Sequence, residues 1–421
     1  MIVTIMPSQA NGKTDAPPSK SMAHRLLICA GLAEGTSKIQ NTDFSEDILA
    51  TIDCLRALGA EISCGDRCVT VRNPLRTGND LPETAQDGPS ILGCRECGST
   101  LRFMIPLCLM DGQSYLLRGS RTLFTRPLTV YEDICAAQGI SFRKEDGQLT
   151  VSGRLSAGEY EIPGNISSQF VSGLLFALPL LDGDSRIRLL PPVESRSYIG
   201  MTMQAQEAFG VCTKWEDDLT IRIRGGQKYK AADTRVEGDY SNAAFFEALN
   251  LAGGSVAVEG LKENSLQGDR VYRQYFDRIQ KGFAEIDLAD CPDLGPVLIA
   301  AAAMQHGARF TGTRRLRIKE SDRGLAMRQE LAKMGVTVET GENEILVPAG
   351  AAHFREGTLI RRPEEPLDGH NDHRIVMALA VMLTKTGGTI RGAEAVKKSL
   401  PDFWERLAGL GVEMRVEQEL V

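Results

Sequence analysis

Cations and carboxylates gather at one point in the C-terminal half, in the segment Lys319-Glu320-Ser321-Asp322-Arg323. A basic stretch, 314–318, precedes it, and a strongly helical pattern follows it. The N-terminus of a helix favours anions because its first backbone N–H groups are unpaired. A carboxylate held among cations at such a place could move a proton. The segment therefore predicts a site that binds an anion and transfers a proton.

Two further cationic clusters stand at predicted helix starts. One is Lys20-Ser21 with Arg25, and the other is Asn371-Asp372-His373-Arg374. Lys and Arg side chains bind phosphate and carboxylate groups through charge-assisted hydrogen bonds. Three cationic helix starts in one chain indicate a ligand that carries several such groups.

Four weaker candidates each have an ordinary structural alternative. Glu96 to Arg102 is typical of an anion-binding turn in which Gly98 permits close backbone approach, or it is a plain loop before a helix. Ser167-Ser168-Gln169 offers two hydroxyls and an amide, or simply a helix cap. Asp293 could be a general base, or the cap of the helix that follows it through Met304. Lys398 could reach an anion, or lie in a solvated basic turn.

No metal or cofactor is predicted. Cys64, Cys68, Cys94 and Cys97 could in principle bind zinc, but Cys64 and Cys68 flank a probable hairpin turn. His370 and His373 could also bind a metal, but the adjacent Arg374 favours anion binding.

Composition excludes several classes of protein. The length of 421 residues predicts two domains, and a net charge of −7 gives no basic field for nucleic acid. Ten cysteines in so long a chain indicate reduced thiols and a cytoplasmic location. The N-terminus does not resemble a signal peptide, and no apolar run approaches about 18 residues, so we expect no membrane span.

The chain repeats one pattern six times, and this pattern predicts an α/β fold. A helix that ends in Gly before a strand recurs with Gly59, Gly139, Gly210, Gly335 and Gly411, and more weakly with Gly282. It alternates with an apolar helix that ends in a glycine turn before another strand. The alternation predicts units of the type strand, helix, strand, helix and hairpin, each about 70 residues long.

The fourth unit and the two domain crossings stand out. Only a short segment separates Gly282 from Asp293, so we expect this unit to lack its hairpin. A stiff segment, 15–19, and a glycine-rich one, 224–230, are the expected crossings. They predict one domain of residues 1–18 plus 229–421 and another of residues 19–228, with the ligand site in the cleft between them.

In their order along the whole chain, these motifs resemble the EPSP synthases of the enolpyruvyl transferase family. The resemblance rests on Lys20-Ser21-x-x-x-Arg25, Gly98-Ser99-Thr100-Leu101-Arg102, Arg126-Pro127, Ser167-Ser168-Gln169, Lys319 to Arg323, Asn371 to Arg374, and Lys398. It implies two domains, each an inside-out α/β barrel of three βαβαββ repeats about a pseudo-threefold axis. It also implies transfer of the carboxyvinyl group of phosphoenolpyruvate to the 5-hydroxyl of shikimate 3-phosphate, on the way to chorismate and the aromatic amino acids. The family reaction runs by addition and elimination through a tetrahedral intermediate and needs no metal.

The resemblance also implies roles for individual residues. Shikimate 3-phosphate is expected at Ser21, Arg25, Ser167, Ser168, Gln169, Ser195 and Lys319, with Tyr198 close by. Phosphoenolpyruvate is expected at Lys20, Arg126, Arg323, Arg374 and Lys398, with Gly98 beside it. The implied catalytic residues are Asp293 as the base for the 5-hydroxyl, Glu320 as the acid at the methylene carbon, and Lys20 as a catalytic cation.

Departures from the family pattern and rival functions stay open at this point. Glu96, Phe103 and Arg315 stand where many relatives have other residues. The nearest rival is the UDP-N-acetylglucosamine enolpyruvyl transferase, which shares fold and donor, and a second is a non-catalytic anion-binding relative. The room beside Gly98 makes glyphosate a possible inhibitor, and we expect a monomer because the two domains complete their own cleft.

Overall fold

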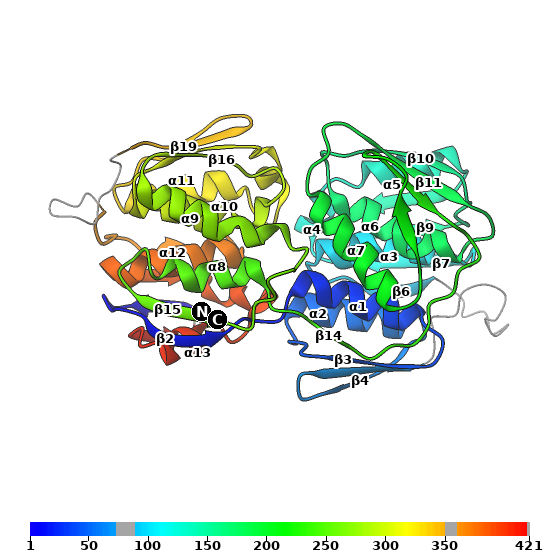
Figure 1. Cartoon of the computed structure of the whole chain (residues 1–421), viewed down its shortest axis with the longest axis horizontal. Helices are drawn as coiled ribbons and strands as arrows, with labels where there is room; N and C mark the ends of the chain where they lie inside the picture. The colour runs from blue at the N-terminus through cyan, green and yellow to red at the C-terminus, as the bar shows by residue number, and fades with distance from the viewer. Residues whose placement is uncertain (73–88, 350–359, 419–421) are drawn as a thin grey trace. The chain divides into compact units, whose positions relative to one another are not determined.

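The computed structural model describes residues 1–72, 89–349 and 360–418, and in it the chain forms two compact units. Unit 1 comprises Met1–Pro17 and Gly238–Val421, and unit 2 comprises Pro18–Glu237. Each unit has its own apolar core. Within each unit the longest helices lie in the middle and the sheets cover the outside (Figure 1).

Unit 2 contains three four-stranded sheets built on one plan, in which a parallel pair of strands is extended by an antiparallel hairpin. In sheet order the strands are β14 (Thr234–Arg235), β3 (Thr36–Gln40), β5 (Cys68–Arg72) and β4 (Glu61–Gly65); β6 (Ser90–Gly93), β7 (Ser114–Arg118), β9 (Gln148–Ser152) and β8 (Ser141–Glu145); and β10 (Glu159–Pro163), β11 (Ser185–Leu190), β13 (Thr220–Ile223) and β12 (Thr213–Trp215).

Unit 1 follows the same plan with one exception. Its sheets are β16 (Ala284–Asp287), β17 (Ala308–Thr311), β19 (Glu344–Val347) and β18 (Glu339–Thr340); β20 (Leu367–Asp368), β21 (Gly388–Arg391), β1 (Ile2–Ile5) and β22 (Met414–Glu417); and the two-stranded pair β15 (Ser255–Glu259) and β2 (Asn11–Asp15). The N-terminal strand β1 pairs with both β21 and β22, which ties the two ends of the chain into one unit.

The helices fill the interior because their sequences are apolar on most faces. Those of unit 2 are α1 (Lys20–Leu32), α2 (Glu46–Ala57), α3 (Gly98–Cys108), α4 (Arg121–Thr125), α5 (Thr129–Ala137), α6 (Ser168–Ala177), η1 (Leu178–Leu180) and α7 (Arg196–Ala208). Those of unit 1 are α8 (Tyr240–Ala248), η2 (Gly268–Val271), α9 (Tyr272–Lys281), η3 (Pro292–Leu294), α10 (Gly295–Met304), η4 (Arg314–Ile318), α11 (Arg323–Lys333), α12 (His373–Thr386), η5 (Ala393–Lys398) and α13 (Phe403–Gly409). Every residue of α10 is buried, as is expected for a helix surrounded by protein.

The predicted α/β repeat plan is confirmed by this topology. The glycines expected to end helices in the left-handed conformation do so at Gly59, Gly139, Gly210, Gly335 and Gly411, where φ lies between 68° and 103°. The weaker sixth copy also has a helix that ends before Gly282 and a strand after it, but its glycine is not left-handed, because Gly282 has an extended φ of 167°.

The fourth repeat is short, as its sequence predicted. Helix α9 is followed by two residues, Gly282 and Phe283, and then directly by β16, so its sheet is the two-stranded β15–β2 pair with no hairpin. The shortened repeat leads straight into the segment that carries Asp293.

The crossing into unit 1 lies after Glu237, later than the expected boundary after residue 228. The intervening residues belong to unit 2 because the Tyr229 side chain is buried in its core and β14 pairs with β3. Within the described residues, no helix is both long and apolar enough to cross a membrane.

Candidate active site

The carboxylate of Asp293 is the centre of the charged cluster in unit 1. Its Oδ1 lies 2.8 Å from Arg323 Nη1 and 3.1 Å from Lys319 Nζ. Its Oδ2 accepts from Arg374 Nη2 at 3.3 Å. Burial would raise the pKa of this carboxyl, but the charges of Arg374, Lys319 and Arg323 outweigh it and hold the pKa well below the ordinary value.

The interpretation of Asp293 as a simple helix cap is wrong. The helix that follows, α10, has Leu294 at its N-cap and no capping hydrogen bond from a side chain. Asp293 lies within the short helix η3, and its carboxylate is held by the three cations instead. Three cations around one carboxylate suit an anion-binding site, because they pair with that carboxylate until an anionic ligand takes its place.

Arg323 connects the members of this cluster. Its side chain is only 1% exposed, and its guanidinium contacts Asp293, Glu320 (Nη2 to Oε2, 2.8 Å) and Asp372 (Nε to Oδ2, 2.9 Å). Burial alone would lower the pKa of Arg323, but the three carboxylates raise it, so this guanidinium is a permanent cation. It therefore fixes the spacing between Asp293 and Glu320, the predicted base and acid.

Lys319 is the cation of this cluster whose pKa lies nearest to neutral pH. Burial lowers its pKa to about 8, assisted by Arg315 and Arg323 and opposed by Asp293 and Glu320. It precedes α11, which begins at Arg323 with Asp322 as its N-cap. The predicted cationic helix start is present, but Lys319 and Glu320 lie in the turn before the helix.

The turn before α12 adds two more predicted residues. Asp372 caps α12 by accepting from the backbone N–H of Arg374 at 2.9 Å. Lys398, at the end of η5, donates to the backbone oxygen of Asn371 at 2.6 Å. Asn371 and His370 both have a left-handed backbone, with φ of 50° and 49°. Lys398 is thus held at the turn that orients Arg374.

In unit 2 the predicted residues form a second cluster around Arg25. Its guanidinium donates to Thr202 Oγ1 (2.8 Å) and to the backbone oxygens of Ser21 (2.6 Å) and Tyr198 (3.1 Å). Burial lowers the pKa of Arg25 to about 10, so the group is still a cation at neutral pH. The N-cap of α1 is Ser19, not Ser21, which leaves Ser21 inside the first turn of α1.

Lys20 opens α1, and its Nζ lies 2.7 Å from Asp47 Oδ2 on α2. Both side chains are mostly buried, at 15% and 11% exposed. Asp47 is therefore part of the cluster, although no motif in the sequence marked it.

Gly98 and Arg126 meet at the start of α3. A Cβ atom on Gly98 would lie 2.6 Å from Arg126 Nη1, so only glycine lets this guanidinium approach the helix start. Next to them, Gln169 accepts from Arg102 Nη1 at 2.7 Å and donates to Ser99 Oγ at 2.9 Å. The α3 and α6 motifs, distant in sequence, thus form one polar surface.

The remaining predicted residues lie at the starts of α6 and α7. Ser167 is the N-cap of α6 and accepts from the backbone N–H of Gln169 at 3.3 Å, and Ser168 is the first residue of the helix. Ser195 precedes α7 with a left-handed φ of 55° and is fully buried. Tyr198 lies in the first turn of α7, with its ring 5.8 Å from the Arg25 guanidinium carbon.

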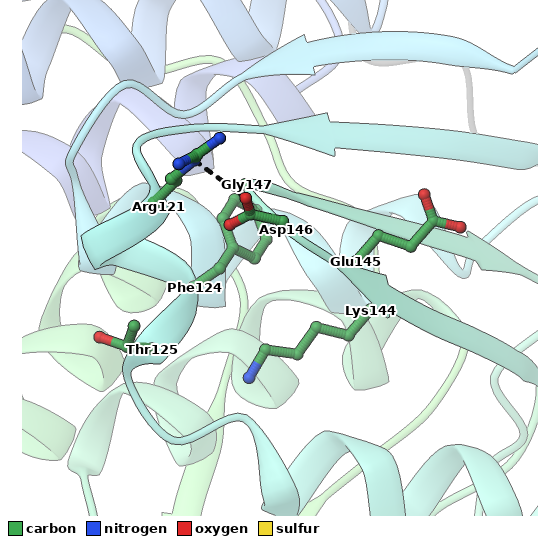
Figure 2. A pocket seen from close by; sticks show the side chains of 7 residues that line it. All are labelled: Arg121, Phe124, Thr125, Lys144, Glu145, Asp146 and Gly147. Carbon is green, nitrogen blue, oxygen red and sulfur yellow. Dashed lines mark ion pairs between the residues drawn. The ribbon is translucent and has the colours of Figure 1, made fainter.

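A hollow of about 370 Å³ in unit 2 has a different lining (Figure 2). It is lined by α4 and the turn between β8 and β9, and Arg121 pairs there with Asp146 at 2.9 Å. Its lining includes none of the predicted site residues, although Thr125, the last residue of α4, is followed directly by Arg126.

The sequence did not predict that Asp372 and Asp47 pair with the predicted cations. Asp372 was quoted as part of a cationic cluster, but its buried contact with Arg323 depends on the fold. Asp47 stands in an ordinary acidic first turn of α2 and gave no signal. Both are carboxylates that hold a cation in place.

Comparison with known proteins shows which family this chain resembles along nearly its whole length. The family model described as EPSP synthase (3-phosphoshikimate 1-carboxyvinyltransferase) matches residues 5–407. A 3-phosphoshikimate 1-carboxyvinyltransferase of Clostridium kluyveri is 39% identical over 98% of each chain, and one of Clostridium novyi is 37% identical over 97% of each chain.

Solved structures show the same fold. The EPSP synthase of Acinetobacter baumannii superposes with a TM-score of 0.79 at 24% identity, covering 99% of this chain and 100% of that one. The enolpyruvyl transferase NikO of Streptomyces tendae superposes with a TM-score of 0.75 at 14% identity, covering 98% of both chains.

Proposed function

Since the chain belongs to the EPSP synthase family, we propose that its two charged clusters bind shikimate 3-phosphate and phosphoenolpyruvate and move the protons of the transfer between them. The activity is that of a 3-phosphoshikimate 1-carboxyvinyltransferase, a transferase of the shikimate pathway. The carboxyvinyl group of phosphoenolpyruvate passes to the 5-hydroxyl of shikimate 3-phosphate, and phosphate is released.

The assignment of the catalytic groups rests on the three cations that contact Asp293. One of them, Arg323, also contacts Glu320. Asp293 takes the proton of the 5-hydroxyl as the oxygen attacks the donor. Glu320 gives a proton to the methylene carbon, which becomes a methyl group in the tetrahedral intermediate. In the elimination step Glu320 recovers a proton from that methyl group as phosphate leaves.

The low pKa of Asp293 belongs to the state without substrate, where the cations pair with it. Bound substrates bring phosphate and carboxylate groups that compete for Lys319 and Arg374. Once those cations turn to the substrates, Asp293 loses part of the charge that depresses its pKa, and burial then favours the protonated form. The carboxylate becomes a better base at the moment when both substrates are present.

Arg323 acts in this scheme chiefly as a positioning residue. Its donors already serve three carboxylates, and its side chain is almost wholly buried. It holds Asp293 and Glu320 at a fixed separation, while Lys20, Arg126, Arg374 and Lys398 remain to bind phosphoenolpyruvate. Preorganised cations of this kind stabilise the charge of the intermediate.

The polar cluster of unit 2 is assigned to shikimate 3-phosphate. Arg25 supplies positive charge, and hydroxyls and an amide of Ser21, Ser167, Ser168, Ser195 and Gln169 suit a phosphorylated, hydroxyl-rich ring. We also assign Lys319, a residue of unit 1, to shikimate 3-phosphate. Tyr198 is assigned to the same substrate because its ring lies 5.8 Å from the Arg25 guanidinium carbon.

Substitution of Asp293 tests the proposal. Asp293→Asn keeps the size of the side chain but cannot accept the proton, so kcat should fall at least about a hundredfold. Glu320→Gln should cause a similar loss. Steady-state kinetics with both substrates saturating, and the exposed neighbour variant Asp290→Asn as control, give the measurement. Near-normal turnover in either variant would remove that residue from its role.

We further propose that glyphosate, an anion like the donor, binds beside Gly98 and Arg126. The support is the close approach of the Arg126 guanidinium to Gly98, where a Cβ atom would lie 2.6 Å from Nη1. We also propose a cytoplasmic location and a monomer. All ten cysteines are free thiols, which is typical of a reducing compartment, and each unit closes its own core.

A further inference from the structure

Three potential metal ligands meet beside Lys20. His24 on α1, Asp47 on α2 and Cys97 at the N-cap of α3 each place a ligand atom within 4.8 Å of the other two. The Cys97 sulfur lies 3.9 Å from His24 Nε2. Zinc bonds of about 2.0 Å to nitrogen and 2.3 Å to sulfur, at a tetrahedral angle, would need only a slightly shorter separation.

The histidine is already oriented as a ligand. Its Nδ1 lies 2.7 Å from Thr51 Oγ1, and Thr51 Oγ1 lies 2.7 Å from Thr100 Oγ1. If Nδ1 carries the proton and donates it to Thr51, the lone pair of Nε2 faces Cys97. A second hydrogen bond that fixes the tautomer in this way is the usual support of a metal-bound histidine.

Charge and access also suit a divalent cation. A thiolate and the Asp47 carboxylate together balance a charge of two. Cys97 and His24 are 2% and 1% exposed, whereas the side chains of Lys20 and Asp47 are 15% and 11% exposed and form the side of the cluster nearest to solvent. A metal would enter there and compete with the Lys20 ammonium for Asp47, which now accepts from it at 2.7 Å.

We propose that His24, Asp47 and Cys97 form an inhibitory site for a borderline-soft divalent cation such as Zn²⁺. Binding releases the thiol proton of Cys97 to solvent, forms a bond from the metal to sulfur, and separates Lys20 from Asp47. The nitrogen, sulfur and oxygen set favours Zn²⁺ over Mg²⁺, which prefers oxygen ligands. The inhibitory part of the proposal rests on the role proposed above for Lys20.

The site can be tested with the metal alone. The metal-free protein is titrated with Zn²⁺ by calorimetry and with Co²⁺ by absorption, where a thiolate ligand gives a charge-transfer band. The expected result is one tight site with a thiolate band, and at least about tenfold weaker binding with no band in Cys97→Ser, which keeps an N-cap side chain. The exposed-thiol variant Cys212→Ser is the matched control and should bind like the unaltered protein.

Turnover is measured in parallel, with and without EDTA. Zn²⁺ should inhibit the unaltered protein and Cys212→Ser reversibly, and Cys97→Ser should resist it. The proposed site is wrong if Cys97→Ser binds Zn²⁺ as tightly as the unaltered protein, or if the Co²⁺ spectrum lacks a thiolate band. Cys97-dependent binding without inhibition overturns its coupling to Lys20. An absence of turnover in EDTA alone speaks instead against the proposed function, so the two failures are distinguishable.

Discussion

The buried guanidinium of Arg323 contacts three carboxylates, and each carboxylate has a different proposed role. Asp293 is the proposed base, Glu320 the proposed acid, and Asp372 the cap of α12 that anchors the arginine. A buried cation of this kind is stable only because all three partners are present, since an unpaired buried charge is costly. The Arg323 guanidinium therefore holds the proposed acid and the proposed base together.

Lys319 gives the cluster a specific pH dependence. Its pKa of about 8 lies below the ordinary lysine value, so it loses its charge as the pH rises through about 8. Because the proposed role of the charged form is to bind substrate phosphate, the KM for shikimate 3-phosphate should rise above this pH. Lys319→Arg, which stays charged, should move that rise to higher pH. The measurement is KM as a function of pH for both proteins.

The opposite result would identify Lys319 as a proton acceptor. In that case the neutral amine would be the active form, and kcat would increase as the pH passes about 8. Lys319→Arg would then lose kcat at every pH while retaining KM.

The variant Gly98→Ala tests the geometry of the proposed phosphoenolpyruvate site. The new Cβ of Gly98→Ala would lie 2.6 Å from Arg126 Nη1 and must displace that guanidinium. Since the far end of an arginine moves easily, the fold should persist, while the KM for phosphoenolpyruvate rises several-fold. Glyphosate inhibition should weaken. An unchanged inhibition constant for glyphosate would show that the steric argument is wrong.

At the scale of elements, the helix starts are set by caps that also place charges. Asp322 accepts from the backbone N–H of Leu325 at 3.0 Å and so begins α11, with Arg323 as the first residue of that helix. The same arrangement recurs at Asp372 and α12. A capped start fixes the direction of the first side chains of the helix.

Loss of this cap should have a measurable cost. Asp322→Ala should lower the free energy of unfolding by about 1 kcal/mol, the usual value for a lost N-cap. Asp322→Asn retains an acceptor and should lose much less. Chemical denaturation of the three proteins checks this. Equal stability of Asp322→Ala and the unaltered protein would mean that the hydrogen bond contributes nothing.

The sequence was sufficient to predict the repeat plan, because helix and strand periods and terminal glycines are local signals. It also predicted the short fourth repeat, where Gly282 leaves no room for a hairpin before β16. It did not predict which charges pair. The contacts of Lys20 with Asp47 and of Arg323 with Asp372 join different helices, and side-chain pairing of this kind depends on the packed core. For the same reason the sequence alone does not decide whether Asp293 is a general base or a helix cap.

At the scale of the whole molecule, each of the two units carries part of the charge that the reaction requires. Unit 1 holds Asp293, Glu320 and their cations, and unit 2 holds Lys20, Arg25 and the hydroxyl groups. The crossing after Glu237 lay beyond the expected position because β14 completes a sheet of unit 2 before the chain leaves it. A short parallel strand of two residues has too weak a sequence pattern to be predicted.

Phosphate release from phosphoenolpyruvate in the presence of EDTA, measured with one acceptor at a time, tests the proposed activity. We expect release with shikimate 3-phosphate and none with UDP-N-acetylglucosamine. Release with the nucleotide sugar alone, or with neither acceptor, would contradict it.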